Sequence, residues 1–479
     1  MPTPTASYNI PSVNVSIADF GLRLSPPVPG KKLTLIGRTT ATLNNTLIVN
    51  EPYQVADVGI GVNGLKNTDG THSELSLAVE QAAAAGADNI EVIVCSQTSD
   101  YATVNDRWDA LAACYKNIAA HPMDTVHPVD TWVDVSGLSG SDSVYTETRS
   151  NFGKQLANFC YRASKAGNSV QGVIGLKPLL QVAKDESWSS ATTSDPQVKF
   201  ATPTLAQLNE WVSHVRSLSG TLKDHSAETV MSNYVYGSVE DSPGVISSSY
   251  DWYAKETDGT TGKDHLGNKV DGGRAICVFG SVSRQLSDSI PDLAAKNGYA
   301  GTLSINTNGA VAYAALLSTL LPDVSPGNQT ITSLIPARDI PQQFAVDMLN
   351  SRVVTMVNRT TGYVVSDGIT SAFNAGKYTR SDYVNWTTYS IVLAAIDLCK
   401  LAAEPYLNKP ASPAILNAMK NQIDRNLDVL KARQAVARIT STLIQSADQN
   451  IIGDLDVMLD IAIYGELKSI NVKASLSRV

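Results

Sequence analysis

The chain has 479 residues, a hydrophobic fraction of 43% and a charged fraction of 17%, which is the composition of a folded protein with two or three domains. Its net charge of -8 argues against non-specific binding to nucleic acid, because such binding needs a net basic surface. The five cysteines are scattered and form no C-x-x-C pair, so we expect buried, reduced thiols in a protein made in the cytosol. We find no signal-peptide pattern and no apolar run near the ~18 residues of a membrane span, and we expect no membrane anchoring.

Residues 1–28 are predicted to form an extended N-terminal arm. Prolines flank a short segment in which Val13, Val15 and Ile17 share one face. This alternation predicts a half-buried strand, and the proline-rich flanks indicate that the strand pairs away from its neighbours in sequence.

From residue 29 to residue 335, helix and strand patterns alternate. Strands are predicted at 33–37, 90–95, 131–135, 170–174 and 274–279, and helices at 74–85, 105–120, 152–166 and 205–218. Such alternation predicts an α/β domain with a largely parallel sheet. The stretch at about 220–273, rich in Ser, Gly, Asp and Thr, is predicted to be a surface insertion.

Residues 336–465 are predicted to form a second domain, of α+β type. The segment 352–365 predicts a hairpin, and helices are expected at 381–403 and 413–437. Near the end of the chain, an alternating strand places Val457, Leu459, Ile461 and Ile463 on one face.

A last alternating strand lies in a predicted C-terminal β arm at 466–479. Its apolar face consists of Ile470, Val472, Ala474 and Leu476. The edges of such a strand can be satisfied by pairing with another chain.

The segment Gly59–Gly64 matches G-x-G-x-x-G, the dinucleotide fingerprint. That fingerprint needs a helix directly after the glycines, whereas the loop 65–70 follows here. We therefore favour a plain glycine-rich loop and keep a nicotinamide-dependent α/β oxidoreductase as the alternative.

Two His and two Asp, namely His121, Asp124, His127 and Asp130, could suggest a metal site. Each His precedes a proline, which would splay the side chains, and no second cluster completes a coordination sphere. We favour a polar loop after a helix. No G-x-S-x-G, Walker or H-E-x-x-H motif occurs, so we expect no catalytic residue, no metal, no cofactor and no enzyme activity.

The helix predicted at 413–437 carries a local excess of positive charge. Its cations are Lys420, Arg425, Lys431 and Arg433, beside Asp424 and Asp428 and an apolar stripe. Two interpretations remain open. It is either a solvated surface with i,i+4 ion pairs or a docking surface for an acidic partner.

The order of these features resembles the contractile phage tail sheath family over most of the chain. The resemblance depends on Pro11-Ser12-Val13-Asn14-Val15 in the arm, on the stretches 29–39 and 75–94, and on the succession of hairpin, two helices and two terminal strands. Ser12 stands where the family usually has glycine.

The resemblance implies a subunit that polymerises as stacked hexameric rings around an inner tail tube and contracts to drive the tube through the host envelope. The N-terminal and C-terminal arm strands would join sheets of neighbouring subunits, and the strand with Val457 would receive them. The basic helix would face the tube. The expected partners are other copies of the chain and the tail tube, baseplate and tail terminator proteins, in a virion tail assembled in the host cytoplasm. Another virion component, such as a tube or baseplate protein, is a further alternative.

Overall fold

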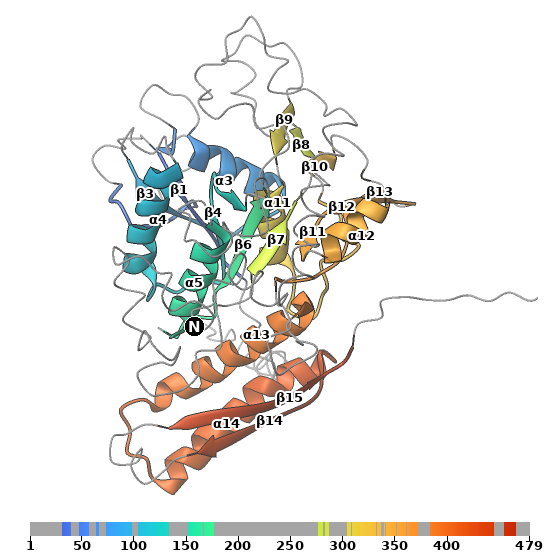
Figure 1. The fold of residues 1–479 in the computed structure, drawn as a ribbon. Coiled ribbons are helices and arrows are strands. Elements are labelled where there is room, and N and C mark those ends of the chain that lie inside the picture. The colour runs from blue at the N-terminus through green and yellow to red at the C-terminus, as the bar shows by residue number, and fades with distance from the viewer. Residues whose placement is uncertain are drawn as a thin grey trace, which may run out of the picture. The chain divides into compact units, whose positions relative to one another are not determined.

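The computed structural model describes two compact units of the chain (Figure 1). The described residues are 31–39, 47–56, 64–66, 73–97, 104–133, 152–165, 167–176, 276–280, 283–286, 304–307, 309–331, 333–336, 340, 342–350, 352–360, 362–371, 384–444 and 455–465. Unit 1 comprises Met1–Pro29 and Ser390–Val479, and unit 2 comprises Gly30–Tyr389. Both predicted terminal arms, the helix at 205–218 and the insertion at 220–273 lie outside the described residues.

Unit 2 is built on an eight-stranded sheet with the order β11-β7-β6-β4-β1-β3-β2, in which β5 also pairs with β6. Its strands are β1 (Leu33–Arg38), β2 (Pro52–Gln54), β3 (Ile90–Ser96), β4 (Thr125–Pro128), β5 (Trp132–Val133), β6 (Gln171–Leu176), β7 (Ile276–Phe279) and β11 (Val353–Val354). All pairs are parallel except β2 with β3. The prediction of a largely parallel α/β sheet is confirmed.

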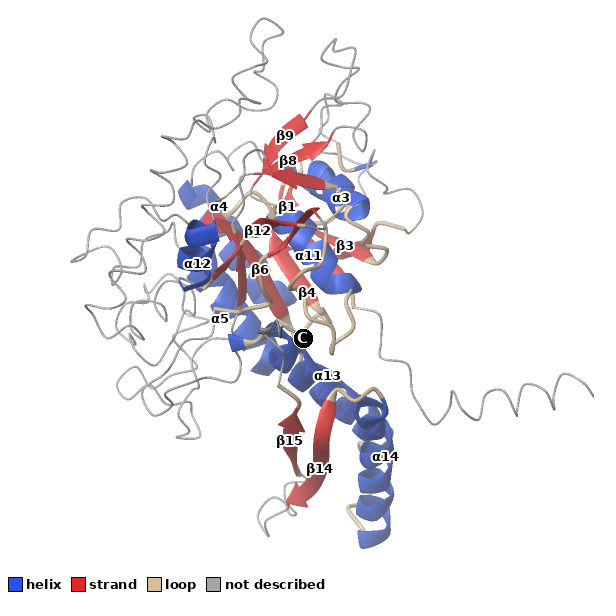
Figure 2. Ribbon diagram, turned by 90° about the vertical axis from the view of Figure 1, so that its right-hand side faces the viewer, coloured by secondary structure: helices blue, strands red, loops and turns tan. Residues whose placement is uncertain are grey.

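Helices cover both faces of this sheet (Figure 2). On one face, α4 (Val104–Ile118), α5 (Phe152–Lys165) and α12 (Gln342–Asn350) pack with strand residues such as Ile36 and Ile93. On the other face, α3 (Glu74–Ala84) and α11 (Ala310–Thr319) pack with Leu35 and Val92. Neighbouring residues of one strand point to opposite faces, so both faces of β1 and β3 must be apolar, as their sequences are.

One expectation about this sheet is wrong. The segment with His127 and Pro128 was expected to be a polar loop, yet it is β4, a fully buried central strand that pairs with β1 and β6. Pro128 is the last residue of β4 and lies beyond the pairing with β6, which ends at Val126, so its missing N–H removes no hydrogen bond to that strand. His127 is buried, and its Nδ1 lies 2.9 Å from the Val173 carbonyl oxygen, which provides the hydrogen bond that a buried imidazole needs.

Two small antiparallel sheets complete unit 2. One has the order β10-β8-β9, with β8 at Ser283–Leu286, β9 at Ser304–Thr307 and β10 at Leu334–Pro336. The other is the predicted hairpin, with β12 at Met356–Arg359 and β13 at Gly362–Val365. Gly362 has a φ of 108°, a conformation that side-chain-bearing residues rarely adopt.

The boundary between the compact units falls between Tyr389 and Ser390, whereas the sequence led us to expect a boundary after residue 335. The reason is that the intervening segment contributes to the core of unit 2. Strand β11 extends the large sheet beside β7, and Met348 and Trp386 are fully buried in its two apolar clusters.

In the described part of unit 1, the chain forms two helices and a β-hairpin. Helix α13 (Trp386–Ala403), whose residues from Ser390 onward lie in unit 1, is followed by a 3₁₀ turn (Glu404–Tyr406), α14 (Pro413–Ala432), β14 (Val436–Ile444) and β15 (Asp456–Ile463). By length and composition, Trp386–Tyr406 could cross a membrane, but 61% of its apolar window is buried, and a core helix passes the same test.

The helix predicted at 413–437 ends five residues earlier than expected, at Ala432. Gln434 has a φ of 58°, which interrupts the helical path, and β14 begins at Val436. Strand β14 was not predicted. A register shift between Val436 and Arg438 breaks the alternation of its apolar residues, which is the signal that would have indicated a strand.

Candidate assembly surface

The antiparallel hairpin β14–β15 is the candidate assembly surface (Figure 2). Within the described residues its sheet consists of these two strands alone. One edge of each strand therefore has no strand partner in that part of the chain. Backbone N–H and C=O groups on such an edge can pair with a strand from another molecule.

One face of the hairpin lies against the core of unit 1. The apolar residues of β15, namely Val457, Leu459, Ile461 and Ile463, are half-buried and pack on a cluster formed by α13 and α14. On β14, Val436 and Ile439 are buried in the same cluster. The four β15 residues thus share one face, and their role as recipients of a neighbour's strand stays a prediction.

The opposite face is exposed and mixed in character. Met458 is 59% exposed and Ile444 is 41% exposed. Arg438 Nη2 lies 2.8 Å from Asp460 Oδ2 across the two strands, with both side chains more than 60% exposed. A surface ion pair of this kind contributes little to stability, so burial of the inner face holds the hairpin in place.

Polar contacts also tie the hairpin to its helices. Ser441 Oγ on β14 donates a hydrogen bond of 2.5 Å to Asp424 Oδ1 on α14, and Lys420 Nζ donates one of 2.6 Å to Asp424 Oδ2. Burial raises the pKa of Asp424, but these two hydrogen bonds, together with the attraction of the Lys420 and Lys431 charges, outweigh it and hold the pKa below its usual value. Asn426 Nδ2 bonds the Leu398 carbonyl oxygen of α13 at 3.2 Å. The hairpin thus lies on a braced pair of helices.

The four cations of the predicted tube-facing helix do not share one face. Lys420 and Lys431 lie along one flank, because eleven residues are close to three full turns. Arg425 is turned away from Lys420 by roughly 140°, and Arg433 is the C-terminal cap.

Two of these cations are already paired within α14. Lys420 Nζ lies 2.6 Å from Asp424 Oδ2, and Lys431 Nζ lies 2.8 Å from Asp428 Oδ1. These i,i+4 and i,i+3 pairs match the interpretation of a solvated helix surface at those two positions. Arg425 is exposed as well.

The described flanks of the glycine motif differ from those of a dinucleotide site. Residues 57–63 lie outside the described part of the chain, but both flanks are described. Among the described elements, the strand before the motif, β2, is an antiparallel edge strand, and the helix after it, α3, begins at Glu74. Its N-terminus is capped by Ser73, whose Oγ accepts a 3.0 Å hydrogen bond from Ser76 N. A pyrophosphate site needs the glycines directly at a helix N-terminus.

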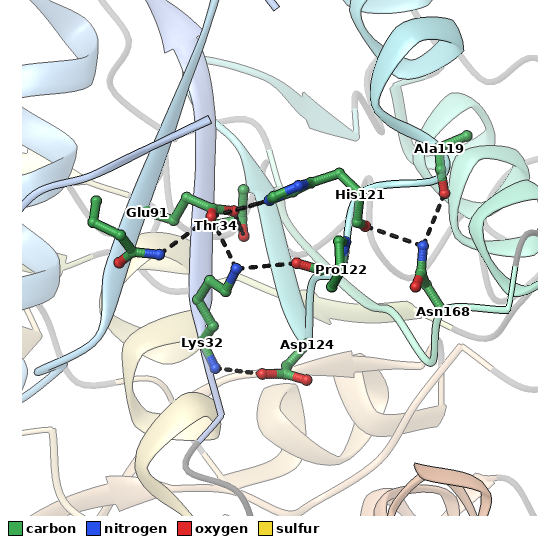
Figure 3. Close-up of polar contacts among 9 residues, drawn as sticks. Lys32, Thr34, Glu91, Ala119, His121, Pro122, Asp124 and Asn168 are labelled. Atoms are coloured by element: carbon green, nitrogen blue, oxygen red, sulfur yellow. Dashed lines mark hydrogen bonds and ion pairs between the residues drawn. The ribbon is translucent and has the colours of Figure 1, made fainter. Parts of the chain in front are cut away.

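The His and Asp residues considered as metal ligands are separated in the structure. His121 and Asp124 lie near the amino ends of β1 and β3 (Figure 3). His127 is buried within β4, and burial lowers its pKa to about 4. Asp130 pairs with Arg107 at 3.3 Å, and burial raises its pKa to about 7. Among the described residues no group of three or more His, Cys, Asp or Glu could hold a metal ion.

A buried carboxylate, Glu91, organises the amino-end cluster instead (Figure 3). Its oxygens accept hydrogen bonds from Lys32 Nζ at 2.9 Å, Thr34 Oγ1 at 3.0 Å and Gln54 Nε2 at 3.2 Å, and His121 Nε2 lies 3.0 Å away. Nearby, Asn168 Nδ2 bonds the carbonyl oxygens of Ala119 and His121. Ligands in parallel α/β sheets bind at the carboxyl ends of the strands, so this cluster is structural. Sequence reasoning missed this cluster. The signal that could have indicated it is Glu91, a charged residue inside the apolar run of β3.

The fold of the chain is that of contractile sheath proteins. No protein-family model matches the sequence, and neither does a curated protein. Among solved structures, the chain is similar to the sheath of the extracellular contractile injection system PVC in its contracted state, with a TM-score of 0.53 at 8% identity over 94% of this chain and 93% of that one. It is also similar to the contracted helical sheath of the anti-feeding prophage, with a TM-score of 0.51 at 9% identity over 93% of both chains.

Proposed function

We propose that the chain is the structural subunit of a contractile sheath. The observation that carries the proposal is the likeness to two sheath structures over more than nine-tenths of both chains. A likeness of that extent includes the two-helix and hairpin unit as well as the α/β sheet. No step of the proposed function needs a catalytic group.

In this proposal, subunits form hexameric rings that stack as a helix. The N-terminal strand with Val13, Val15 and Ile17 and the C-terminal strand with Ile470, Val472, Ala474 and Leu476 pair with β14–β15 hairpins of neighbouring subunits. Two observations support this pairing. Within the described residues the β14–β15 sheet has only two strands, and the hairpin packs on α13 and α14. An open edge on a braced support is suited to β-strand addition.

Contraction is proposed to be a rigid-body rearrangement of subunits that stay linked through these strands. Unit 1 would form the inner layer around a tail tube, and unit 2 would provide the outer layer. The tail tube, baseplate and terminator proteins are the proposed partners. The assembly would form in the host cytoplasm and act as part of a virion tail or injection particle.

Electron microscopy of the purified full chain tests the proposal. A sheath subunit should form hollow tubes whose lumen is wide enough for a tail tube. Narrow tubes or isolated rings would favour a tube or baseplate protein instead. A titration with NAD⁺ and NADP⁺ followed by thermal unfolding tests the enzyme alternative, because a bound ligand must raise the unfolding temperature. We expect no shift and hollow tubes, and the reverse result would overturn the proposal.

A further inference from the structure

The two places where the backbone passes between the compact units lie next to each other on unit 2. These passages fall between Pro29 and Gly30 and between Tyr389 and Ser390. Lys31 follows the first passage and Trp386 precedes the second. The Lys31 Nζ atom lies 4.6 Å from the centre of the Trp386 ring, a cation–π contact. Two connections far apart in sequence therefore leave unit 2 from one place.

The first connection is anchored at the amino end of β1 (Figure 3). Lys32 N donates to Asp124 Oδ2 at 2.6 Å, while Lys32 Nζ donates to Glu91 at 2.9 Å and to the Pro122 carbonyl oxygen at 3.1 Å. Strand β1 then pairs on one side with β3 and on the other with β4. A pull along β1 acts across both sets of ladder hydrogen bonds at once, so they must break together.

The second connection is anchored at the start of α13. The Trp386 side chain is fully buried, and its backbone N–H donates to the Gly368 carbonyl oxygen at 3.0 Å. Just before it, Thr370 N donates to the Val384 carbonyl oxygen at 2.8 Å. Ser371 in turn exchanges two hydrogen bonds with Ile276 at the beginning of β7. The helix thus begins on a segment that is bonded to the large sheet.

We infer that the Lys31–Trp386 contact joins the two anchored connections into a single joint. Without it, each connection would open separately under load. With it, opening one connection removes a contact from the other, so the two are coupled. The coupling itself does not depend on the proposed function. Its biological role does rest on the proposed function, because a contracting sheath must carry force between the unit that polymerises and the unit that does not.

Amide hydrogen exchange of the full chain, below the concentration at which it polymerises, tests this joint. Lys31→Met keeps most of the side-chain length and removes the charge. We expect it to speed exchange about two- to five-fold both at residues 32–35 and at residues 386–389, in line with the strength of an exposed cation–π contact. Lys31→Arg keeps the cation over the ring and should restore the slow exchange at both segments.

Lys409→Met is the matched control, since Lys409 Nζ lies 5.1 Å from the Tyr406 ring within unit 1 and belongs to neither connection. It should leave both segments unchanged. Faster exchange in Lys31→Met at only one segment, or at neither, would overturn the joint. The measurement does not need the polymer. Coupled exchange in a chain that never forms tubes would refute the sheath proposal alone, and uncoupled exchange in a chain that forms tubes would refute the joint alone.

Discussion

Glu91 on β3 and Lys32 at the amino end of β1 form a largely buried ion pair, with 2.9 Å between Oε2 and Nζ. The Glu91 side chain is 3% exposed and that of Lys32 is 20% exposed. Burial raises the pKa of Glu91, but the hydrogen bonds with His121 and Lys32, together with the attraction of their charges, outweigh it and hold the pKa below its usual value. The ionised carboxylate therefore stabilises the folded state.

Glu91→Gln should lower the free energy of unfolding by about 2 kcal/mol at pH 7, because the variant leaves Lys32 without its charged partner. A carboxyl with a lowered folded pKa stabilises above its unfolded pKa, and that stabilisation is lost as the pH falls through the folded pKa. The difference between the two proteins in urea denaturation should thus shrink below about pH 4.5. Glu51→Gln, at an exposed position of unit 2, is the control and should show no difference. A difference that is equal at pH 7 and pH 3 would contradict this account.

His127 gives a second pH-dependent prediction. Burial lowers its pKa to about 4, so the folded protein keeps the imidazole neutral while the unfolded chain binds a proton below about pH 6.5. Stability should fall by up to about 3 kcal/mol as the pH drops from 6.5 to 4. His127→Asn can still donate to the Val173 carbonyl oxygen but does not titrate, so its pH profile should be flatter.

The measurement is the difference between the wild-type and His127→Asn profiles. Asp130, with a pKa raised to about 7 by burial, titrates over an overlapping range with the opposite sign. Its contribution is common to both proteins and cancels in the difference. Parallel profiles would mean that His127 does not titrate as the structure requires.

The two faces of the β14–β15 hairpin should respond differently to truncation. Ile439 is 2% exposed and packs in the cluster of unit 1, so Ile439→Ala should lower the free energy of unfolding by about 3 kcal/mol. Met458 is 59% exposed on the other face, and Met458→Ala should change it by less than about 0.5 kcal/mol. Chemical denaturation of both variants checks the prediction. Equal losses would show that the hairpin does not pack on α13 and α14 as described.

Deletion of residues 470–479 should leave a folded subunit that cannot form tubes. The deleted strand is proposed to pair with a neighbouring subunit, so its loss removes intermolecular bonds and leaves the core of either unit intact. Circular dichroism and thermal unfolding should match the full chain, while electron microscopy should find no tubes. Normal tubes from the truncated chain would exclude a role for this strand in assembly.

Reversal of charge on α14 tests the proposed contact with a tail tube. Lys420→Glu with Lys431→Glu, at the two cations that share one flank of α14, should reduce assembly on an acidic tube by about tenfold or more, since two attractions become repulsions. Lys409→Glu, an exposed position outside α14, is the matched control. Assembly should be followed by co-sedimentation with tubes at two salt concentrations. An unchanged yield would leave α14 as a solvated surface, as the pairs of Lys420 and Lys431 with Asp424 and Asp428 indicate.

Several elements could be predicted from local patterns. The helix predicted to begin at Pro413 does begin there, and Ser412 caps it, since Ser412 Oγ accepts a hydrogen bond from Ile415 N at 3.4 Å. The hairpin of β12 and β13 and the buried strands β1 and β3 also lie where the patterns place them. These features depend on neighbours in sequence, through capping, turn geometry and the periodicity of apolar residues.

Elements whose formation depends on distant partners were missed or misplaced. The histidine and proline of β4 led to the prediction of a loop. The buried His127 imidazole is stabilised by a hydrogen bond with the carbonyl oxygen of Val173 on the adjacent strand, which a local pattern cannot indicate. Strand β14 loses its alternation at a register shift that is set by pairing with β15. The boundary of unit 2 lies after Tyr389 because Met348, β11 and Trp386 fill its core.

The sequence by itself determined the alternation of helices and strands, the apolar face of β15, and the resemblance to contractile sheath proteins. Each of these follows from the order of residues along a single segment. The tertiary structure alone decided that Glu91 gathers Lys32, Thr34, Gln54 and His121, that the cations of α14 point in different directions, and that Lys31 meets Trp386. Those relationships join residues from different elements, and the packing of the whole chain brings such residues together.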